Sequence, residues 1–305
     1  MPPRPPTFAD MTLRPTAVAT ILLTTMVLSS TASAQSILSE ETWELSSGKA
    51  IWGIELPGYQ VGNVAGSELG GFRSDGDSPG FLWDGTLIRR FAGYRTQFEL
   101  NGFWGTAGIN SSSSDDDITF FNNAGTLNQV LTGGGGHLDH DVAAYGFDIG
   151  LRDTWRFPIG GLSAGLKYST FAIDQDFDLE FGGSRILEEE LDTDFNGGKG
   201  FVGWEGTALG YVSRLDLSYG YYDVDAEFSS DNRLFGDRTA LDFKDQTGIT
   251  ELSATVYFPS NFGLMSVGAG VKYIEDMPGV EKVNGVTTID TDDAALYRLM
   301  ATFYY

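Results

Sequence analysis

The sequence predicts an all-β protein in which about ten antiparallel strands close into a transmembrane β-barrel. Three features support this fold: segments in which apolar and polar residues alternate, connections that alternate between tight turns and long loops, and an apolar segment near the N-terminus. Alternation with a period of two places one set of side chains on each face of a strand. Strands of about ten such residues, separated by turns, are typical of barrels that cross a membrane.

The first residues predict a secretory signal peptide. Arg14 precedes the apolar run 17–28, and the small-x-small sequence 32–34 follows it. We expect cleavage after Ala34, which leaves residues 35–305 as a single barrel domain. An uncleaved membrane anchor is the alternative, which the short length of the apolar run disfavours.

Composition excludes several classes of protein. The chain of 305 residues contains no cysteine, so it has no disulfide framework and no cysteine for a lipid anchor. Its formal net charge is −23. Because binding to nucleic-acid phosphates needs a basic surface, we expect no nucleic-acid partner.

Ten segments carry the alternation of a half-buried strand. The first two are weaker than the others, so a barrel of eight strands is the alternative, with 49–90 as a periplasmic or plugging segment. In chain order the predicted strands are 49–56, 80–90, 94–101, 143–152, 162–169, 202–208, 215–221, 251–258, 265–273 and 293–305.

The connections distinguish a membrane barrel from a soluble β-sandwich. Membrane barrels have tight turns at one end and long loops at the other, whereas a sandwich or a lipocalin-like barrel has no reason to keep this rhythm. The short connections are 89–93, 157–161, 211–214 and 259–263, and the long ones are 109–141, 173–198, 223–247 and 275–292. Aromatic residues that would form a girdle at one membrane interface lie beside the short connections: Phe91, Trp155, Phe157, Tyr211, Phe258, Phe262 and Tyr305.

The last strand, 293–305, places Tyr297, Leu299, Phe303 and Tyr305 on one face and ends on an aromatic residue. In this it resembles the closing strand of bacterial outer-membrane β-barrel proteins. The resemblance implies that these four residues form a signal read by the barrel-assembly machinery. It also implies residence in the outer membrane, in contact with lipid and lipopolysaccharide, with the short turns facing the periplasm.

If the apolar faces meet lipid, the polar faces line the lumen. A barrel of eight to ten strands is only wide enough for side chains to fill, and buried charges are costly unless they are paired. We therefore expect a narrow lumen crossed by salt bridges rather than a wide diffusion pore. The predicted lumen-lining charges are Arg95, Glu99, Asp148, Arg152, Lys167, Glu205, Asp216, Glu251, Lys272 and Arg298.

The acidic excess lies in the predicted long loops. Most such runs are solvated surfaces that keep a protein soluble. The functional alternative is a negative vestibule that concentrates cations, or carboxylates that bind Ca²⁺ or Mg²⁺, so divalent cations are a candidate partner and a metal site stays open. The densest run is Asp174, Asp176, Asp178, Glu180, Glu188, Glu189, Glu190, Asp192 and Asp194, with Arg185 as its single basic residue.

Signals for catalysis are sparse. The two histidines, His137 and His140, lie beside Asp139 and Asp141, a combination that could bind Zn²⁺ or supply a base with an orienting acid. No residue matches the motifs of barrel proteases or lipid A-modifying enzymes. We expect no catalytic residues and no cofactor.

The predicted function is that of a non-enzymatic barrel, either structural or a narrow porin-like channel that favours cations. One alternative is a surface-exposed binding or adhesion barrel that acts through its acidic loops. The other is a barrel hydrolase with a rim active site at His140 and Asp139.

Overall fold

A computed structural model describes residues 43–64, 70–74, 78–91, 95–109, 113–114, 117–122, 126–132, 135–158, 160–208, 210–260, 263–283 and 287–304. Every regular element in these ranges is a strand. None of the described residues forms a helix long and apolar enough to cross a membrane. The predicted signal peptide, Phe262 and Tyr305 lie outside the described residues.

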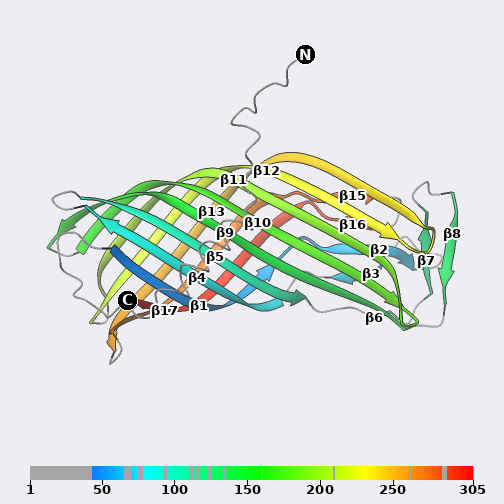
Figure 1. Ribbon diagram of the computed structural model, residues 1–305, viewed down its shortest axis with the longest axis horizontal. Helices are drawn as coiled ribbons and strands as arrows, with labels where there is room; N and C mark the ends of the chain where they lie inside the picture. The colour runs from blue at the N-terminus through cyan, green and yellow to red at the C-terminus, as the bar shows by residue number, and fades with distance from the viewer. Residues whose placement is uncertain are drawn as a thin grey trace, which may run out of the picture.

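Ten strands form a closed antiparallel ring (Figure 1). The ring closes because β9 pairs with β5 on one side and with β10 on the other. In ring order the strands are β1 (Trp43–Glu55), β4 (Ser78–Arg90), β5 (Thr96–Ile109), β9 (Gly136–Phe157), β10 (Gly160–Phe181), β11 (Ser184–Ala208), β12 (Tyr211–Asn232), β13 (Asp237–Ser260), β14 (Gly263–Met277) and β17 (Asp292–Tyr304). The predicted closed barrel of ten strands is confirmed.

The alternative of eight strands is wrong. β1 pairs with β4 from Trp43 opposite Arg89 to Ile54 opposite Ser78, and β1 pairs with β17 on its other edge. The region that the alternative treated as a plug is therefore part of the wall. Its pattern is weak because β1 turns its large apolar residues Trp52 and Ile54 inward, where both are buried.

The wall has two heights. β1, β4, β5, β14 and β17 contain 13 to 15 residues each, whereas β9 to β13 contain 22 to 25. The loops predicted at 173–198 and 223–247 are therefore corrected to hairpins. β10 and β11 are joined by Gly182 and Gly183 alone, whose φ angles of 59° and 76° suit glycine.

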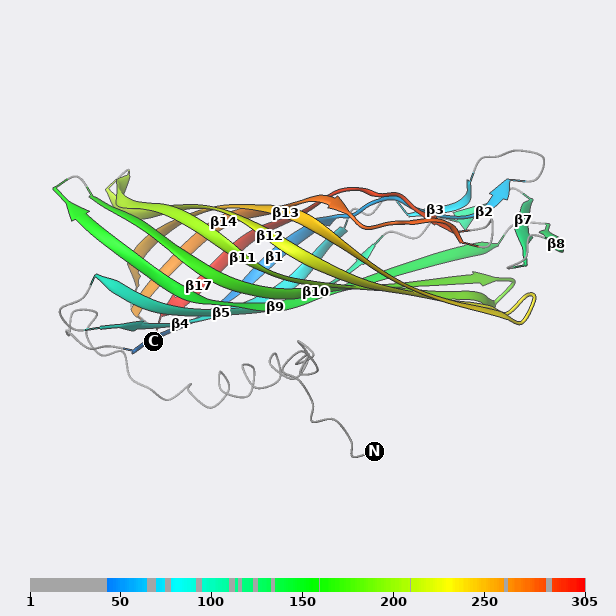
Figure 2. The same ribbon diagram turned by 90° about the horizontal axis from the view of Figure 1, so that it is seen from above.

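The segments between β1 and β4, between β5 and β9 and between β14 and β17 build a second, smaller sheet, which we call the cap sheet. Its strand order is β15-β16-β2-β7-β8, with β3 paired to β2, and it lies at the end of the molecule away from the C-terminus (Figure 2). β6 (Ser113–Ser114) extends the main sheet beside β9. The cap sheet strands are β2 (Tyr59–Val64), β3 (Gly70–Ser74), β7 (Ile118–Phe121), β8 (Asn128–Leu131), β15 (Val280–Val283) and β16 (Thr287–Ile289).

The molecule divides into two halves along the barrel axis. The tall half is the cap sheet together with the upper parts of β9 to β13, which are residues 136–143, 173–195 and 222–247. The barrel half is the remainder of the ring, and it ends at the short turns, where both β1 begins and β17 ends.

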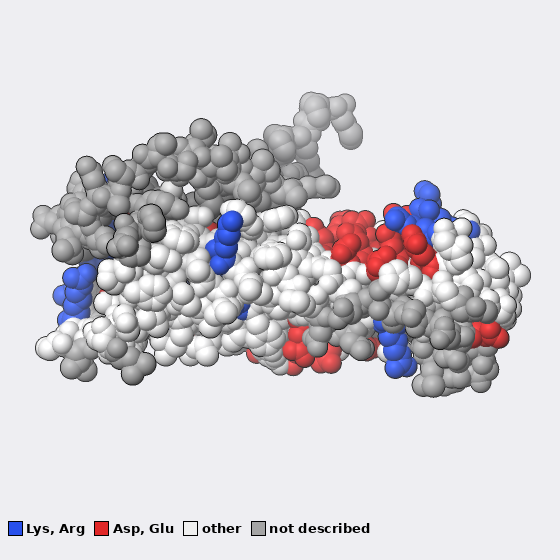
Figure 3. Space-filling view, turned by 90° about the horizontal axis from the view of Figure 1, so that it is seen from below, with Lys and Arg blue, Asp and Glu red and all other residues white. Residues whose placement is uncertain are grey.

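In the barrel half, large apolar side chains point outward. Leu166 is 74% exposed, and Leu217, Val267 and Leu299 are also exposed rather than gathered in a common interior. Acidic side chains instead gather over the tall half, as the space-filling view shows (Figure 3). A closed ring with an outward apolar band is the arrangement of barrels that span membranes.

Candidate functional site

The lumen of the barrel half begins, at the short-turn end, with a layer of paired charges. Arg152 is central: its Nε donates to Glu99 Oε1 at 2.7 Å and its Nη1 to Asp216 Oδ1 at 2.8 Å. Lys167 Nζ approaches the other oxygen of Glu99 at 2.8 Å, and Arg214 Nε donates to Asp216 at 2.6 Å. These residues come from β5, β9, β10 and β12, so the network ties the barrel wall together from inside.

A second group of charges lies deeper in the same layer. Lys199 Nζ donates to Asp148 at 2.8 Å and to Glu251 at 2.9 Å, and Lys272 Nζ approaches Glu251 at 3.1 Å. Lys272 also lies 3.9 Å from the centre of the Phe171 ring. Pairing of this kind is what a narrow, low-dielectric lumen requires of its charges.

The structure brings most of the predicted lumen residues together. Glu99, Arg152, Lys167, Asp216, Asp148, Glu251 and Lys272 form the two networks, and Arg298 lines the same cavity. Arg95 and Glu205 are exceptions. Arg95 lies in an exposed bend before β5, and Glu205 is exposed near the short-turn end of β11, because the lumen is open to water at that level.

Sequence reasoning missed three lumen residues. Lys199 lies in a glycine-rich stretch that reads as a loop, and Arg214 in a stretch that reads as a turn. Arg214 shares the parity of Asp216 on β12, so extending the alternation by two residues would have found it. Asp84 is at a lumen-facing position of β4, but the alternation of apolar and polar residues in that strand is weak.

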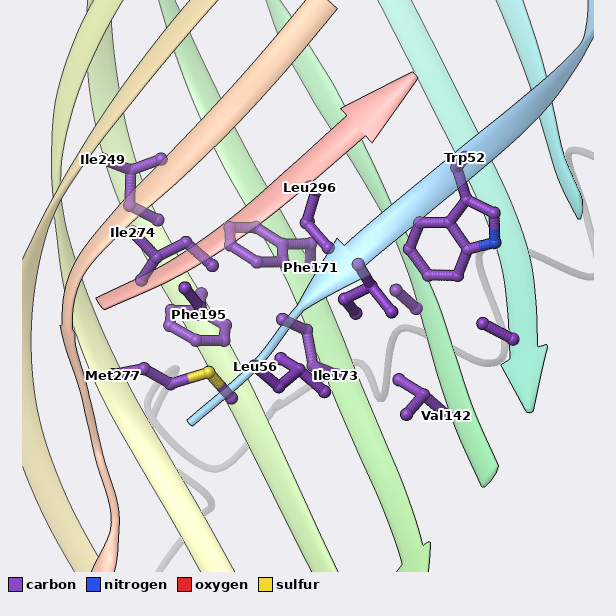
Figure 4. Packing of buried hydrophobic residues seen from close by; sticks show 14 of the residues in the cluster. Trp52, Leu56, Val142, Phe171, Ile173, Phe195, Ile249, Ile274, Met277 and Leu296 are labelled. Carbon is purple, nitrogen blue, oxygen red and sulfur yellow. The ribbon is translucent and has the colours of Figure 1, made fainter. Parts of the chain in front are cut away.

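Above the charges, an apolar layer fills the lumen (Figure 4). Trp52, Phe171, Phe195 and Tyr222 are its largest members, each at most 2% exposed. The Phe171 and Phe195 rings stack with centroids 4.4 Å apart, and Trp52 Nε1 donates to the carbonyl of Thr106. Each of the ten strands supplies at least one member: Ala50, Trp52, Ile54, Leu56, Leu82, Ala107, Ile109, Val142, Ala144, Phe171, Ile173, Phe195, Tyr222, Val224, Ile249, Ile274, Met277, Ala294 and Leu296.

The two histidines lie on opposite faces of β9. His137 and Asp139 point outward and pair at 2.9 Å, whereas His140 points inward and is buried. His140 and Asp139, the two candidates for a rim active site, therefore do not meet, because adjacent residues of a strand face opposite sides. His140 Nδ1 is instead 2.8 Å from Ser74 Oγ, and burial lowers the pKa of His140 to about 3.

This Ser74–His140 pair lacks the setting of a hydrolytic site. Both side chains are 1% exposed, and the His140 ring packs 4.1 Å from Phe177 between the cap sheet and the tall strands. A substrate chain could not reach Ser74 without separating the two sheets. The pair acts as a polar contact that holds β3 to β9.

A buried carboxylate makes the second such contact. Glu189 on β11 accepts hydrogen bonds from Tyr59 at 2.6 Å, Thr287 at 2.7 Å and Ser230 at 2.8 Å. Burial raises the pKa of Glu189. Tyr59 belongs to β2 and Thr287 to β16, so one side chain joins two cap strands to the tall wall.

The outer face of the tall half carries rows of carboxylates. On β10, Asp176 lies opposite Asp141 of β9 and Glu190 of β11. In the next row, Asp174 lies opposite Asp192. Burial, and then the neighbouring carboxylates, raise the pKa of Asp192 to about 6, and burial likewise raises the pKa of Asp174 to about 6.

A few cations border this surface. Arg185 pairs with Asp178 at 2.9 Å, Arg238 with Asp231 at 3.0 Å, and Lys244 with Asp225 at 2.6 Å. Within the described ranges, no group of three or more His, Asp or Glu side chains is arranged to hold a metal ion. The acidic face is a broad negative surface on which the described carboxylates lie in rows.

The predicted signal of the last strand lies on the outside of the barrel. Tyr297, Leu299 and Phe303 point outward from β17 and are 40 to 58% exposed. They are thus placed where lipid or an assembly factor could contact them.

No family model matches the chain, and no curated protein matches its sequence. Among solved structures, the outer-membrane protease OmpT of Escherichia coli is similar over 89% of this chain and 98% of its own, with a TM-score of 0.52 and 9% sequence identity. The translocator domain of the autotransporter NalP from Neisseria meningitidis is matched over 94% of this chain and 97% of its own, with a TM-score of 0.43 and 11% identity. OprG of Pseudomonas aeruginosa is matched over 88% and 98%, with a TM-score of 0.31 and 10% identity.

The predicted resemblance to bacterial outer-membrane barrels is confirmed at the level of the fold. The closed ring of strands has the fold of outer-membrane β-barrel proteins such as OmpT, and its apolar band faces outward as it does in barrels that cross a membrane.

Proposed function

We propose that this protein is a non-conducting, non-enzymatic surface barrel that binds cationic partners through its tall half. The barrel half anchors it in the outer membrane with the short turns toward the periplasm. The tall half then projects from the cell and presents the acidic face. We thus favour a surface-binding function over a narrow channel.

The apolar layer is the observation that supports a barrel that does not conduct ions. All ten strands contribute to it, and its members are at most 8% exposed. An ion that crossed this layer would lose its hydration without gaining polar ligands, which costs several kcal/mol or more. The sealed lumen leaves the outer face of the tall half as the main surface open to a partner.

The acidic face supports a cationic partner. Like charges directly opposite one another on neighbouring strands destabilise a sheet, so rows such as Asp141, Asp176 and Glu190 lower the stability of the free protein. A cationic ligand would relieve this repulsion, and the negative field would accelerate its arrival. Divalent cations remain a weaker candidate partner, held by the same field.

A narrow channel is the second candidate function. A cavity of about 210 Å³ lies in the charged layer, and paired charges of both signs line it. Opening of the apolar layer above it would complete a path through the barrel. Whether the apolar layer stays closed therefore decides between the two functions.

Conductance decides between them. We expect purified protein in planar bilayers to show no steps at any moderate voltage, with an open porin as the positive control. A Phe171→Ala, Phe195→Ala double variant, which thins the apolar layer, should then conduct. Regular steps from the unmodified protein would contradict the sealed barrel.

Binding tests the acidic face. We expect hexalysine to bind the detergent-solubilised protein, with an affinity that falls steeply as salt is raised. The triple variant Asp176→Asn, Glu190→Gln, Asp192→Asn should bind at least ten-fold more weakly. Glu205→Gln, which removes an exposed carboxylate at the opposite end, should bind as the unmodified protein does. An equal loss of affinity per carboxylate removed in the two variants would show that net charge alone determines binding and would refute a site on the tall half.

A further inference from the structure

Two charged side chains of the lumen, Asp84 and Arg298, form no close ion pair with its networks, although Arg298 acts electrostatically on both Asp84 and Glu251. Among the described residues, the ion pairs of the charged layer involve neither Asp84 of β4 nor Arg298 of β17. Asp84 Oδ1 is buried and has no hydrogen-bond partner. Because the carboxylates of Glu99, Asp148, Asp216 and Glu251 are all paired, Asp84 and Arg298 require a separate explanation.

Inward-facing glycines make room for both groups. The Asp84 carboxylate lies over Gly48 of β1, where an added Cβ would collide with Oδ1. The Arg298 guanidinium lies over Gly270 of β14, where an added Cβ would lie 3.0 Å from Nε. The wall is thus recessed beside each charge, on β1 between the two strands that carry them and on β14 on the far side of β17.

Both charges line the cavity of about 210 Å³. Apolar side chains form much of the remaining wall, among them Trp52, Phe103 and Met300. At ~30 Å³ per molecule, the cavity has room for roughly seven waters, or for an organic molecule of about ten non-hydrogen atoms.

The spacing of the two charges suits one small molecule. Arg298 lies opposite Trp52 and Asp84 opposite Gly48, so the two Cα atoms are two strand spacings and four residues apart, roughly 16 Å. The two side chains, extended fully toward each other, reduce this separation to as little as roughly 8 Å. An α-amino acid bridges about that distance when a hydrogen bond of ~2.8 Å is added at each of its charged ends.

We propose that this cavity binds a small zwitterion with a short apolar side chain. Asp84 receives the ammonium group, Arg298 binds the carboxylate, and the apolar wall receives the side chain. A ligand with both charges pairs with both groups at once, whereas a ligand with one charge leaves the other half-buried group without a close ion-pair partner.

Access is from the short-turn end. Charged side chains around the cavity are 15 to 21% exposed at Lys272, Arg214, Asp216 and Glu251, whereas the apolar layer above is at most 8% exposed. Water therefore reaches the cavity from below the apolar layer. The site does not require the barrel to conduct, so it stands or falls separately from the proposed function.

Calorimetry with three related probes tests the proposal without any variant. Leucine carries both charges, 4-methylpentanoate lacks the ammonium group, and 3-methylbutylamine lacks the carboxylate. We expect saturable binding of leucine to the folded, detergent-solubilised protein, and binding at least ten-fold weaker for the other two. No saturable heat from leucine would mean that the cavity holds water only, and equal binding of the three probes would mean that the two charges do not act together; either result overturns the proposal.

Variants then test which residue binds each charged end of the ligand. Asp84→Asn and Arg298→Gln should each weaken leucine binding at least ten-fold, and Asp84→Asn should abolish the preference for leucine over 4-methylpentanoate. Lys49→Gln, on the outer face of β1, is the matched control and should leave binding unchanged. Heat-dependent mobility in SDS gels verifies that each variant is folded. Unchanged leucine binding in folded Asp84→Asn would overturn the assignment.

Discussion

The two halves of the molecule are inside-out relative to each other, and β10 shows both arrangements on one strand. In the barrel half, Leu166 points outward and is 74% exposed, whereas Lys167 points into the lumen. Ten residues further along, Asp176 points outward and Phe177 is buried at 1% exposure. The backbone and the period of two are the same in both places.

The difference shows that the surroundings, rather than the strand, decide which face is apolar. Hydrocarbon outside the barrel half favours apolar side chains there, and the lumen can hold polar groups only if they pair. Water surrounds the tall half, so its apolar side chains pack inside against the cap sheet, as Phe177 does against Tyr59 with ring centroids 3.9 Å apart. The reversal lies between Ser169 and Ile173, and we place the end of the membrane on this strand there.

Removing one buried charge should have the largest effect. Arg152→Met leaves Glu99 and Asp216 with fewer partners inside the barrel half and should lower the free energy of unfolding by about 4 kcal/mol. Lys244→Met removes an ion pair of similar length, but on the exposed outer face of the tall half, and should not measurably move the unfolding midpoint. Urea titrations in lipid vesicles measure both. Equal effects would show that the lumen charges are as hydrated as those of the tall half.

A cation placed on the outer surface should distinguish the two halves with a smaller effect. Leu217→Arg puts a guanidinium against hydrocarbon and should cost about 2 to 3 kcal/mol. Ser229→Arg is twelve residues further along the outward face of β12, beside acidic neighbours, and should cost nothing measurable. The same urea titration serves for both variants. A comparable loss from Ser229→Arg would place the membrane boundary higher than we propose.

Much of the fold could be predicted from the sequence because a period of two is independent of which face is apolar. All ten wall strands were located, including the last, whose outward residues Leu299 and Phe303 share one face. Strand lengths were underestimated. Acidic runs such as 174–180 resemble loops when only apolar faces are taken as evidence of a strand, yet Phe177 and Leu179 alternate with those acids on the opposite face.

The interior was predicted less completely, for a physical reason. Charges on one strand indicate which face is inward, so Glu99, Arg152 and Lys167 could be found one strand at a time. Partners depend on the register between strands and on the closure of the ring, and these set Arg152 against Asp216 across 64 residues of sequence. The apolar layer that closes the lumen could not be predicted either. The sequence does not show that Trp52 and Phe195 face the lumen together until the register of the ring is known.

A pH effect confined to the tall half should be the smallest. The pKa of Asp174 and of Asp192 is about 6 in the folded protein, whereas an unfolded chain has a value near ~3.9. The folded state therefore binds more protons at these two groups between these values, so the stability that they contribute is greatest at low pH and is lost as the pH rises from about 4 to about 6. Partial exposure of both side chains to solvent keeps the effect modest.

Hydrogen exchange, corrected for the intrinsic rate at each pH, measures this effect locally. We expect amides of the hairpin formed by β10 and β11 near Gly182 to be better protected at pH 4.5 than at pH 7, while amides near Leu217 in the barrel half do not change. The Asp174→Asn, Asp192→Asn double variant should reduce the difference, leaving the part due to Asp176 and Glu190, whose pKa values are also raised. Protection that rises with pH in this hairpin would contradict the expected loss of stability and would mean that the carboxylates are held by cations rather than by one another.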